Sequence, residues 1–385
     1  MKRILKALML LYVKLSRYGR RKTPGKNLLL IRLDAIGDYV LFRNFIEVLK
    51  QSERFRDYKI TLVGNVVWKE LAVALDGAAI ERFVWVDKKR FADDLAYFYD
   101  TLLSVSESAY DVIINPMYSR EVNEDWLVFS AAAKQKIGSA GDCSKQTARQ
   151  KRLGDRFYTR LIPTDTGTLF EFERNRHFFE ALLQIQLSIA APYIHPPRRA
   201  PILLPRNFVV LFIGASDPKR RWDIEKFTEL ATYLNRQCGF SIVLCGGPGD
   251  LDEAAAFKER FGGVYTDLVG RTSLTDLLYV FSAAQGLVSN ETSAPHLAVA
   301  LKTPNIIVVS NGNHYGRFTP YPQAVSPAYH AVFPPSVSDK AGDFEASARS
   351  FARGSVLDIN DVTVGMVRKV ASETLCRDIA VGGSA

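Results

Sequence analysis

The feature that most constrains the fold is an alternation of short apolar runs with longer amphipathic stretches. Short apolar runs bounded by turn signals are typical of buried strands, and apolar residues at helical spacing indicate helices. In the first half of the chain such runs occupy 27–33, 59–64, 80–86 and 110–116. Because strand and helix follow each other in turn, we predict an α/β fold whose parallel sheets are covered on both faces.

The alternation is interrupted by a proline- and arginine-rich stretch at 195–205 and then resumes. A length of 385 residues also favours two domains. We predict two Rossmann-like open sheets that face each other, with the ligand in the cleft beyond the carboxyl ends of their strands. The predicted divisions are a basic amphipathic segment (1–26), a first domain (27–198), a second domain (199–340), and a loosely ordered stretch with a closing helix (341–385).

The first 26 residues contain many lysines and arginines and no acidic residue, in a protein of net charge +9. Apolar side chains recur among them at helical spacing, at Ile4, Leu5, Leu8, Leu11, Tyr12 and Leu15. The apolar stretch is much shorter than the roughly 20 residues needed to span a bilayer, and no signal-peptide cleavage pattern follows it. Two interpretations remain open: a helix lying on an anionic membrane surface, and a helix packing on the body of the protein.

The four cysteines are scattered along the chain without close pairs or metal-ligand spacing. They are Cys143, Cys238, Cys245 and Cys376. This pattern predicts neither a disulfide framework nor a zinc site, and it favours a reducing cytoplasm.

The first predicted strand is followed by the turn Asp34-Ala35-Ile36-Gly37-Asp38. The turn lacks the spaced glycines of a dinucleotide fingerprint and the lysine of a P-loop. Acidic residues at this helix start would repel a pyrophosphate. We therefore expect no diphosphate to bind there.

Three strand ends in the second half carry residues suited to a diphosphate. The residues are Gly214, Ser216, Lys219, Arg220, Gly246, Gly247, Thr292 and Ser293. Glycines let the backbone approach a ligand closely, and the free amides of a helix N-terminus favour a phosphate. Together these turns predict a diphosphate site along one edge of the second sheet.

Each of these features also has a simpler interpretation. Thr292 and Ser293 are good helix caps, and Arg220 would also suit a solvated surface. His296 in an apolar helix is as often a packing residue as a ligand contact. Asp38 would favour the helix dipole by its charge alone. The local patterns leave these alternatives open.

Three longer stretches resemble the lipopolysaccharide heptosyltransferases of glycosyltransferase family 9. They are "LLLIRLDAIGDYVLFRNFIEVL", "KRRWDIEKFTELA" and "VGRTSLTDLLYVFSAAQGLVSNETSAPHLAVALKTPNIIVV". The resemblance implies a GT-B fold, with the acceptor bound by the N-terminal half and a nucleotide sugar by the C-terminal half. It also implies inverting transfer without a metal or other cofactor. The family's general base is the aspartate of the Gly-Asp pair, which falls on Asp38, and Gly37 beside it is expected to contact the acceptor. Asp34 falls outside this pair, and two roles remain open for it: a supporting charge or an acceptor contact.

The chain departs from the family pattern at the donor end. Glu291 stands where the family has aspartate, and the glycine that follows in the family is absent from Glu291-Thr292-Ser293-Ala294-Pro295-His296. Lys219 and Arg220 compete for one phosphate-binding position. Further on, His314 and Arg317 are expected to grip the donor phosphates or sugar. The resemblance thus implies a nucleoside diphosphate sugar as donor, with ADP-heptose as one candidate.

These observations predict an inverting transferase that moves heptose or a related sugar to a lipid-linked or oligosaccharide acceptor of lipopolysaccharide or another surface glycan. We expect it to be cytoplasmic and peripheral on the inner face of the cell membrane, through the anionic surface and residues 1–26. A non-catalytic nucleotide-sugar or glycan-binding protein remains the alternative. Nucleic acid is not expected as a partner, because the positive charge is concentrated in 1–26 and a basic loop at 139–156, and no recognised binding module is present.

Overall fold

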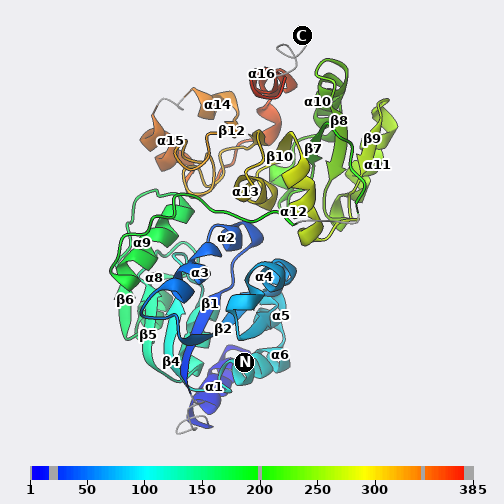
Figure 1. The fold of residues 1–385 in the computed structure, drawn as a ribbon. Helices are drawn as coiled ribbons and strands as arrows, with labels where there is room; N and C mark the ends of the chain where they lie inside the picture. The colour runs from blue at the N-terminus through cyan, green and yellow to red at the C-terminus, as the bar shows by residue number, and fades with distance from the viewer. Residues whose placement is uncertain (1, 17–24, 198–201, 340–342, 377–385) are drawn as a thin grey trace. The chain divides into compact units, whose positions relative to one another are not determined.

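The computed structural model describes residues 2–16, 25–197, 202–339 and 343–376 (Figure 1). These residues form two compact units. Unit 1 contains Met1–Gly167 and Phe172–Ile189, and unit 2 contains Thr168–Glu171 and Ala190–Ala385. Each unit is described by itself.

Unit 1 is built on a six-stranded parallel sheet in the order β3-β2-β1-β4-β5-β6. Its strands are β1 (Lys26–Arg32), β2 (Tyr58–Asn65), β3 (Arg82–Val86), β4 (Tyr110–Asn115), β5 (Ala133–Ser139) and β6 (Arg160–Ile162). In the central strand β1, every residue from 27 to 32 is buried, as expected for a parallel sheet covered on both faces. The strand order reverses between β1 and β4, so the loops after these two strands flank the expected ligand site of this sheet.

One or two helices follow each strand of unit 1, and α1 precedes the first strand. The helices are α1 (Lys2–Ser16), α2 (Ile36–Val40), α3 (Asn44–Gln51), α4 (Lys69–Asp76), α5 (Lys88–Asp93), α6 (Leu95–Val105), α7 (Val122–Ser130), α8 (Ala148–Asp155) and α9 (Glu171–Leu183). Short 3₁₀ turns lie at Val66–Trp68 and Gly77–Ala79. Helix α8 occupies the second half of the segment 139–156, which the sequence predicts to be a loop, and Thr147 and Gln150 form a capping box at its start.

Helix α1 packs against α6 and α7 at the edge of unit 1 (Figure 1). Leu10 and Val13 are buried in the unit 1 core. The Lys6 ammonium donates to the carbonyl oxygens of Phe91 and Ala92, at 2.8 and 3.0 Å. One face of α1 is therefore part of the body of unit 1. Among the described residues, no helix combines the length and apolarity needed to cross a bilayer.

Unit 2 repeats the same architecture with the order β12-β11-β10-β7-β8-β9. Its strands, all parallel, are β7 (Phe208–Phe212), β8 (Ser241–Cys245), β9 (Tyr265–Asp267), β10 (Gly286–Asn290), β11 (Ile306–Val309) and β12 (Tyr329–Val332). The longer helices are α10 (Ile224–Arg236), α11 (Leu251–Arg260), α12 (Leu274–Ala283), α13 (Ser293–Ala300), α15 (Phe344–Phe351) and α16 (Val364–Thr374), and α14 (Pro335–Ser338) is a single turn. The 3₁₀ turns are Pro218–Arg220, Pro248–Asp250 and Ile359–Asp361. The predicted pair of parallel α/β sheets is thus confirmed.

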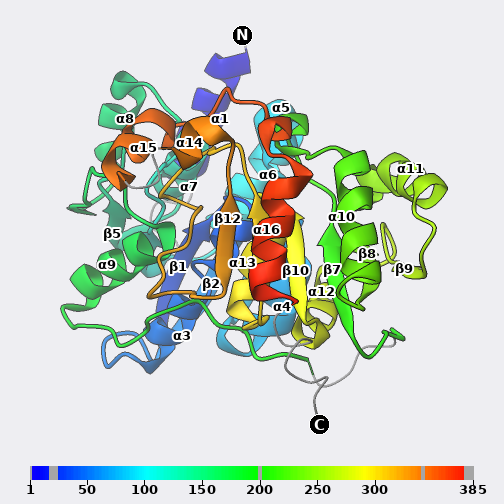
Figure 2. The ribbon, with the colours of Figure 1, turned by 90° about the horizontal axis from the view of Figure 1, so that it is seen from above.

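The prediction that the cysteines form no disulfide is wrong. Cys238, just after α10, is bonded to Cys376, just after α16, with a Cα–Cα distance of 5.4 Å. The two residues are 138 positions apart, and they meet because α16 packs along α10 and across the face of the sheet (Figure 2). Sequence spacing cannot show such a pairing. Because disulfides are uncommon in reducing compartments, the cysteines do not support a cytoplasmic location.

Candidate active site

The turn after β1 places Asp38 at the carboxyl edge of the unit 1 sheet. Asp38 lies in the first turn of α2 and is half-buried, as is Gly37 beside it. Asp34 precedes them and is only 8% exposed. The structure thus brings the three predicted residues of unit 1 into one turn at the strand-order reversal. There a carboxylate with partial access to water can meet a bound hydroxyl group.

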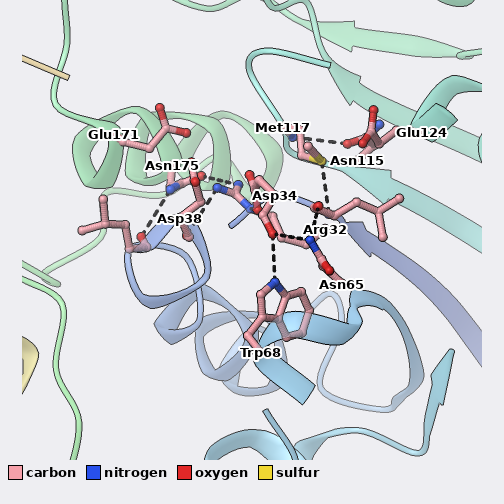
Figure 3. A network of polar contacts seen from close by, with 12 residues as sticks. Arg32, Asp34, Asp38, Asn65, Trp68, Asn115, Met117, Glu124, Glu171 and Asn175 are labelled. Atoms are coloured by element: carbon pink, nitrogen blue, oxygen red, sulfur yellow. Dashed lines mark hydrogen bonds and ion pairs between the residues drawn. The ribbon is translucent and has the colours of Figure 1, made fainter. Parts of the chain in front are cut away.

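Arg32, the last residue of β1, is the centre of a buried polar network under this turn (Figure 3). Its side chain is 0% exposed. Nε donates to Asp34 Oδ1 at 2.9 Å, Nη1 to Asn175 Oδ1 at 3.0 Å, and Nη2 to the Asp38 carbonyl oxygen at 3.4 Å. The Asp34 carboxylate is therefore the counter-ion of a buried arginine, which is the supporting charge that was one of the two roles left open for it.

Side chains from other elements hold the carbonyl groups of the same turn. Asn65 Nδ2 donates to the carbonyl oxygens of Leu33 and Asp34, at 3.1 and 3.2 Å. Trp68 Nε1 also donates to the Asp34 oxygen, at 3.0 Å (Figure 3). Asn175 Nδ2 donates to the carbonyl oxygen of Leu41 at 3.2 Å. Four residues of this network were not predicted as site residues: Arg32, Asn65, Trp68 and Asn175. Arg32 belongs to the first family-like stretch but was assigned only to its apolar strand, and the other three lie outside the quoted stretches.

A second charged cluster follows β3 and β4. Lys88 Nζ lies 2.7 Å from Glu121 Oε1 and 4.0 Å from Glu124 Oε1. Burial raises the pKa of Glu124 to about 8, assisted by the Glu121 charge and opposed by Lys88. Burial acts to lower the pKa of Lys88, but the carboxylates of Glu124 and Glu121 outweigh it and the pKa is raised. The cluster therefore favours the charged forms of Lys88 and Glu121, whereas burial favours the protonated form of Glu124.

In unit 2, Arg220 connects the turn after β7 with the turn after β10. Its Nη2 donates to Ser216 Oγ at 3.0 Å, and its Nη1 to the Glu291 carbonyl oxygen at 3.3 Å. Within the part of the chain that the structure describes, Lys219 bonds through its backbone alone: its amide donates to Asp217 Oδ1, and its carbonyl oxygen accepts from Asn311 Nδ2. Of the two rival cations, Arg220 is the one whose side chain bonds to both turns predicted to bind the diphosphate.

Glu291 is 5% exposed and accepts a short hydrogen bond from Ser310 Oγ. Burial raises its pKa to about 7, against the lowering effects of Ser310, Arg220 and Asn313. Ser310 directly follows β11, so the carboxylate of Glu291 is directed toward the loop after the neighbouring strand. The longer side chain that replaces the family's aspartate is therefore engaged within the protein.

The glycines of the predicted diphosphate site border Asp250. The Gly247 amide donates to Asp250 Oδ2 at 2.7 Å. A Cβ on Gly214 would lie 2.0 Å from the same oxygen, and one on Gly246 would lie 3.0 Å from it. Arg221 pairs with Asp250 at 3.3 Å. Gly214 is thus required for the close packing of two turns, which is independent of any ligand.

Helix α13 begins where the sequence predicts. Of the residues at its start, His296 is occupied by a contact within the protein, and Thr292 makes no side-chain cap bond. Thr292 is at the N-cap without a side-chain cap bond, and Ser293 opens the helix. His296 is buried, with Nδ1 2.7 Å from the Tyr321 hydroxyl. Burial lowers the pKa of His296 to about 4, so the ring is neutral at physiological pH. This is the packing arrangement that the sequence left open for His296.

His314 and Arg317 both have protein partners. His314 has a positive φ of 52°, and its Nδ1 lies 3.1 Å from the Ala352 carbonyl oxygen. Arg317 Nε donates to Glu171 Oε2 at 3.0 Å. Among the described residues, no group of three or more histidine, cysteine or acidic side chains could hold a metal ion.

Known proteins show the same sequence pattern and fold. Residues 103–328 match the family model described as glycosyltransferase family 9 (heptosyltransferase). Lipopolysaccharide heptosyltransferase 3 of Escherichia coli is 23% identical over 293 residues, which cover 72% of this chain and 82% of the relative. The protein of the same name from E. coli strain K12 is 24% identical over 296 residues, which cover 72% of this chain and 80% of the relative.

Two solved structures illustrate the fold. A family 9 glycosyltransferase from Veillonella parvula superposes with a TM-score of 0.67 at 18% identity, covering 90% of this chain and 96% of that one. E. coli heptosyltransferase WaaC with ADP-2-deoxy-2-fluoro heptose gives 0.65 at 20% identity, covering 90% and 99%. The chain is a glycosyltransferase that belongs to family 9 (heptosyltransferase) and has the GT-B fold.

Proposed function

We propose that this protein is an inverting glycosyltransferase that moves heptose or a related sugar from a nucleoside diphosphate sugar to lipopolysaccharide or another surface glycan. The observation that carries the proposal is the half-buried Asp38, held at the carboxyl edge of the unit 1 sheet where its strand order reverses. Such an edge is where open α/β sheets bind ligands.

Asp38 acts as the general base in this reaction. Its carboxylate takes the proton of an acceptor hydroxyl while that oxygen bonds to the anomeric carbon of the donor sugar. The bond between this carbon and the diphosphate oxygen breaks at the same time, and the electron pair leaves with the nucleoside diphosphate. Attack on the face opposite the leaving group inverts the anomeric configuration. Asp34 and Gly37 border the acceptor from the same turn.

The diphosphate binds to unit 2 in this proposal. The charged Arg220 side chain, the Ser216 hydroxyl and the start of α13 at Ser293 offer cationic and amide donors to a developing negative charge. The remaining predicted donor contacts are Gly214, Gly246, Gly247, Lys219, Glu291, Thr292, His296, His314 and Arg317. ADP-heptose is the first candidate donor, because a WaaC structure contains ADP-2-deoxy-2-fluoro heptose and another contains ADP.

A transfer assay tests this function. Wild-type protein is incubated with ADP-heptose and with the glycolipid fraction of a strain in which its gene has been deleted, where the acceptor accumulates. Mass spectrometry should show one added sugar on a glycolipid, and nuclear magnetic resonance should show the inverted anomer. If wild-type protein binds ADP but transfers no sugar from a panel of nucleotide sugars, the non-catalytic binding protein is the correct function.

We also propose, from the exposed face of α1 and not from the cysteines, that the protein is cytoplasmic and binds the anionic inner face of the cell membrane through α1. Five large side chains of α1 are between 49% and 66% exposed: Ile4, Leu8, Leu11, Tyr12 and Leu15. The opposite face of α1 packs on unit 1, so the face that carries these five side chains is free to contact lipid. Apolar residues flanked by basic ones favour the interface of anionic lipids. The basic residues between 17 and 24 lie outside the described residues.

Vesicle sedimentation tests the membrane proposal. Wild-type protein should sediment with vesicles containing phosphatidylglycerol, less so at high salt, and weakly with phosphatidylcholine alone. Leu8→Glu combined with Leu11→Glu should abolish sedimentation. Val73→Glu, which changes an equally exposed valine on α4, is the matched control and should bind normally. Equal binding by the α1 double variant would contradict the proposal.

A further inference from the structure

We propose that Arg32 and Asn175 are positioning residues that fix the turn of the catalytic base for glycosyl transfer. The inference rests on the proposed function, because it assumes that Asp38 is the base. Neither residue contacts the reacting atoms in this account. They act by holding the backbone of residues 33–41 in one conformation.

The Arg32 guanidinium is fully buried. A guanidinium that is 0% exposed has lost its hydration, which is costly unless its donors are bonded and its charge is balanced. The Asp34 carboxylate balances the charge through a 2.9 Å contact with Nε. Phe42 lies against the guanidinium, with 4.8 Å between the arginine Cζ and the ring centroid. An apolar side chain at position 32 would fill the space in an interior strand without this cost, so the arginine has a role beyond packing.

The two Nη groups of Arg32 donate toward α2 and its neighbour Asn175. Nη1 bonds to the Asn175 side chain, and Nη2 bonds to the carbonyl oxygen of Asp38 itself (Figure 3). Asn175 uses its other group, Nδ2, to hold the Leu41 carbonyl oxygen, which follows the end of α2. Arg32 therefore fixes α2 at Asp38, the proposed catalytic base, and Asn175 fixes the chain at Leu41, directly after the helix ends.

Helix α2 is too short to fix its own orientation. The helix contains five residues, Ile36–Val40, and Ala35 at its N-cap makes no side-chain cap bond. A helix this short has little stability of its own. Its orientation must therefore come from tertiary contacts such as those of Arg32 and Asn175. A displacement of the base of about 1 Å can lower a rate by about 100-fold.

The experiment compares kinetics and binding in variants of the full chain. Asn175→Ala should lower kcat about 10-fold, and Arg32→Ala about 100-fold, while the donor KM and the affinity for ADP stay within about twofold of wild type. Arg32→Lys should recover only part of the activity, because one ammonium cannot reproduce the planar guanidinium's contacts with Asp34, Asn175 and the Asp38 carbonyl. Asn235→Ala is the matched control, since Asn235 also donates Nδ2 to a backbone carbonyl, that of Phe240, at 2.9 Å.

The outcomes separate this inference from the proposed function. If Asp38→Asn is inactive while Asn175→Ala and Arg32→Lys keep the wild-type kcat, the positioning role is wrong, but the assignment of Asp38 as the general base stands. If Asp38→Asn is fully active, Asp38 is not the general base, and the positioning role that depends on it is wrong as well. If Arg32→Ala does not fold, the kinetics of Asn175→Ala and Arg32→Lys still test the positioning role. A fall in activity that only follows a loss of folded protein, seen equally in Asn235→Ala, would also overturn the inference.

Discussion

Arg317 Nε lies 3.0 Å from Glu171 Oε2, and the Glu171 amide donates to the Arg317 carbonyl oxygen at 2.9 Å. Both residues belong to unit 2. The Glu171 side chain is 2% exposed and that of Arg317 is 17% exposed. Loss of one partner from a buried ion pair typically costs about 3–5 kcal/mol. Because Arg317 keeps some contact with water, we expect Arg317→Ala to lower the free energy of unfolding in urea by about 2–4 kcal/mol.

Two further variants separate the ion pair from the predicted donor contact of Arg317. The double variant Glu171→Gln with Arg317→Ala should regain part of the lost stability, because no buried carboxylate is left without this cation. If Arg317 also grips the donor, calorimetry will show weaker ADP binding in both variants that lack it and unchanged binding in Glu171→Gln alone. No loss of stability in Arg317→Ala would contradict the structural role of the pair.

Glu291 should make stability depend on pH in unit 2. The folded protein keeps this proton up to about pH 7, whereas an unfolded glutamate releases it near pH 4.5. Its contribution to the free energy of unfolding therefore falls as pH rises between these values. Relative to wild type, Glu291→Gln should be more stable at pH 8 than at pH 5 by up to about 3 kcal/mol. Urea unfolding of both proteins at pH 5 and pH 8 measures this. If the free energies of unfolding of variant and wild type differ by the same amount at both pH values, the pKa of Glu291 is not raised in the folded protein.

The Cys238–Cys376 disulfide should stabilise unit 2 by restricting the unfolded chain. It closes a loop across 138 positions, and cross-links over long loops typically add about 2–5 kcal/mol. Dithiothreitol and the variant Cys238→Ser should therefore lower the urea midpoint by similar amounts. Cys143→Ser, which removes an exposed free thiol, is the control and should have no effect. If oxidised and reduced wild-type protein unfold at the same urea concentration, the cross-link does not exist in solution.

Much of the fold could be predicted from the sequence because strands and helices are local patterns. The apolar run at 27–33 corresponds to β1, and the turn that follows carries Asp38 at the start of a helix, as its motif predicts. Arg220 and Ser216 lie close in sequence, and their contact needs only one turn of chain.

Contacts between distant segments could not be predicted in the same way. Asn175 meets Arg32 across 143 positions, and the only local signal for Arg32 is a cation inside an apolar strand. That cation was a usable signal, because a buried arginine requires partners. Helix α1 was ambiguous for another reason: its sequence has two apolar faces, one of which packs on unit 1 while the other is exposed.

The most direct test of the account is the turnover of Asp38→Asn. Wild type and variant are compared with the same donor and glycolipid acceptor, and ADP affinity is measured for each. Asparagine keeps the size of the side chain but cannot take a proton. The account predicts that kcat falls by about 10²–10⁴-fold while ADP affinity and thermal stability stay unchanged. A variant that transfers sugar at the wild-type rate would contradict the assignment of Asp38 as the general base.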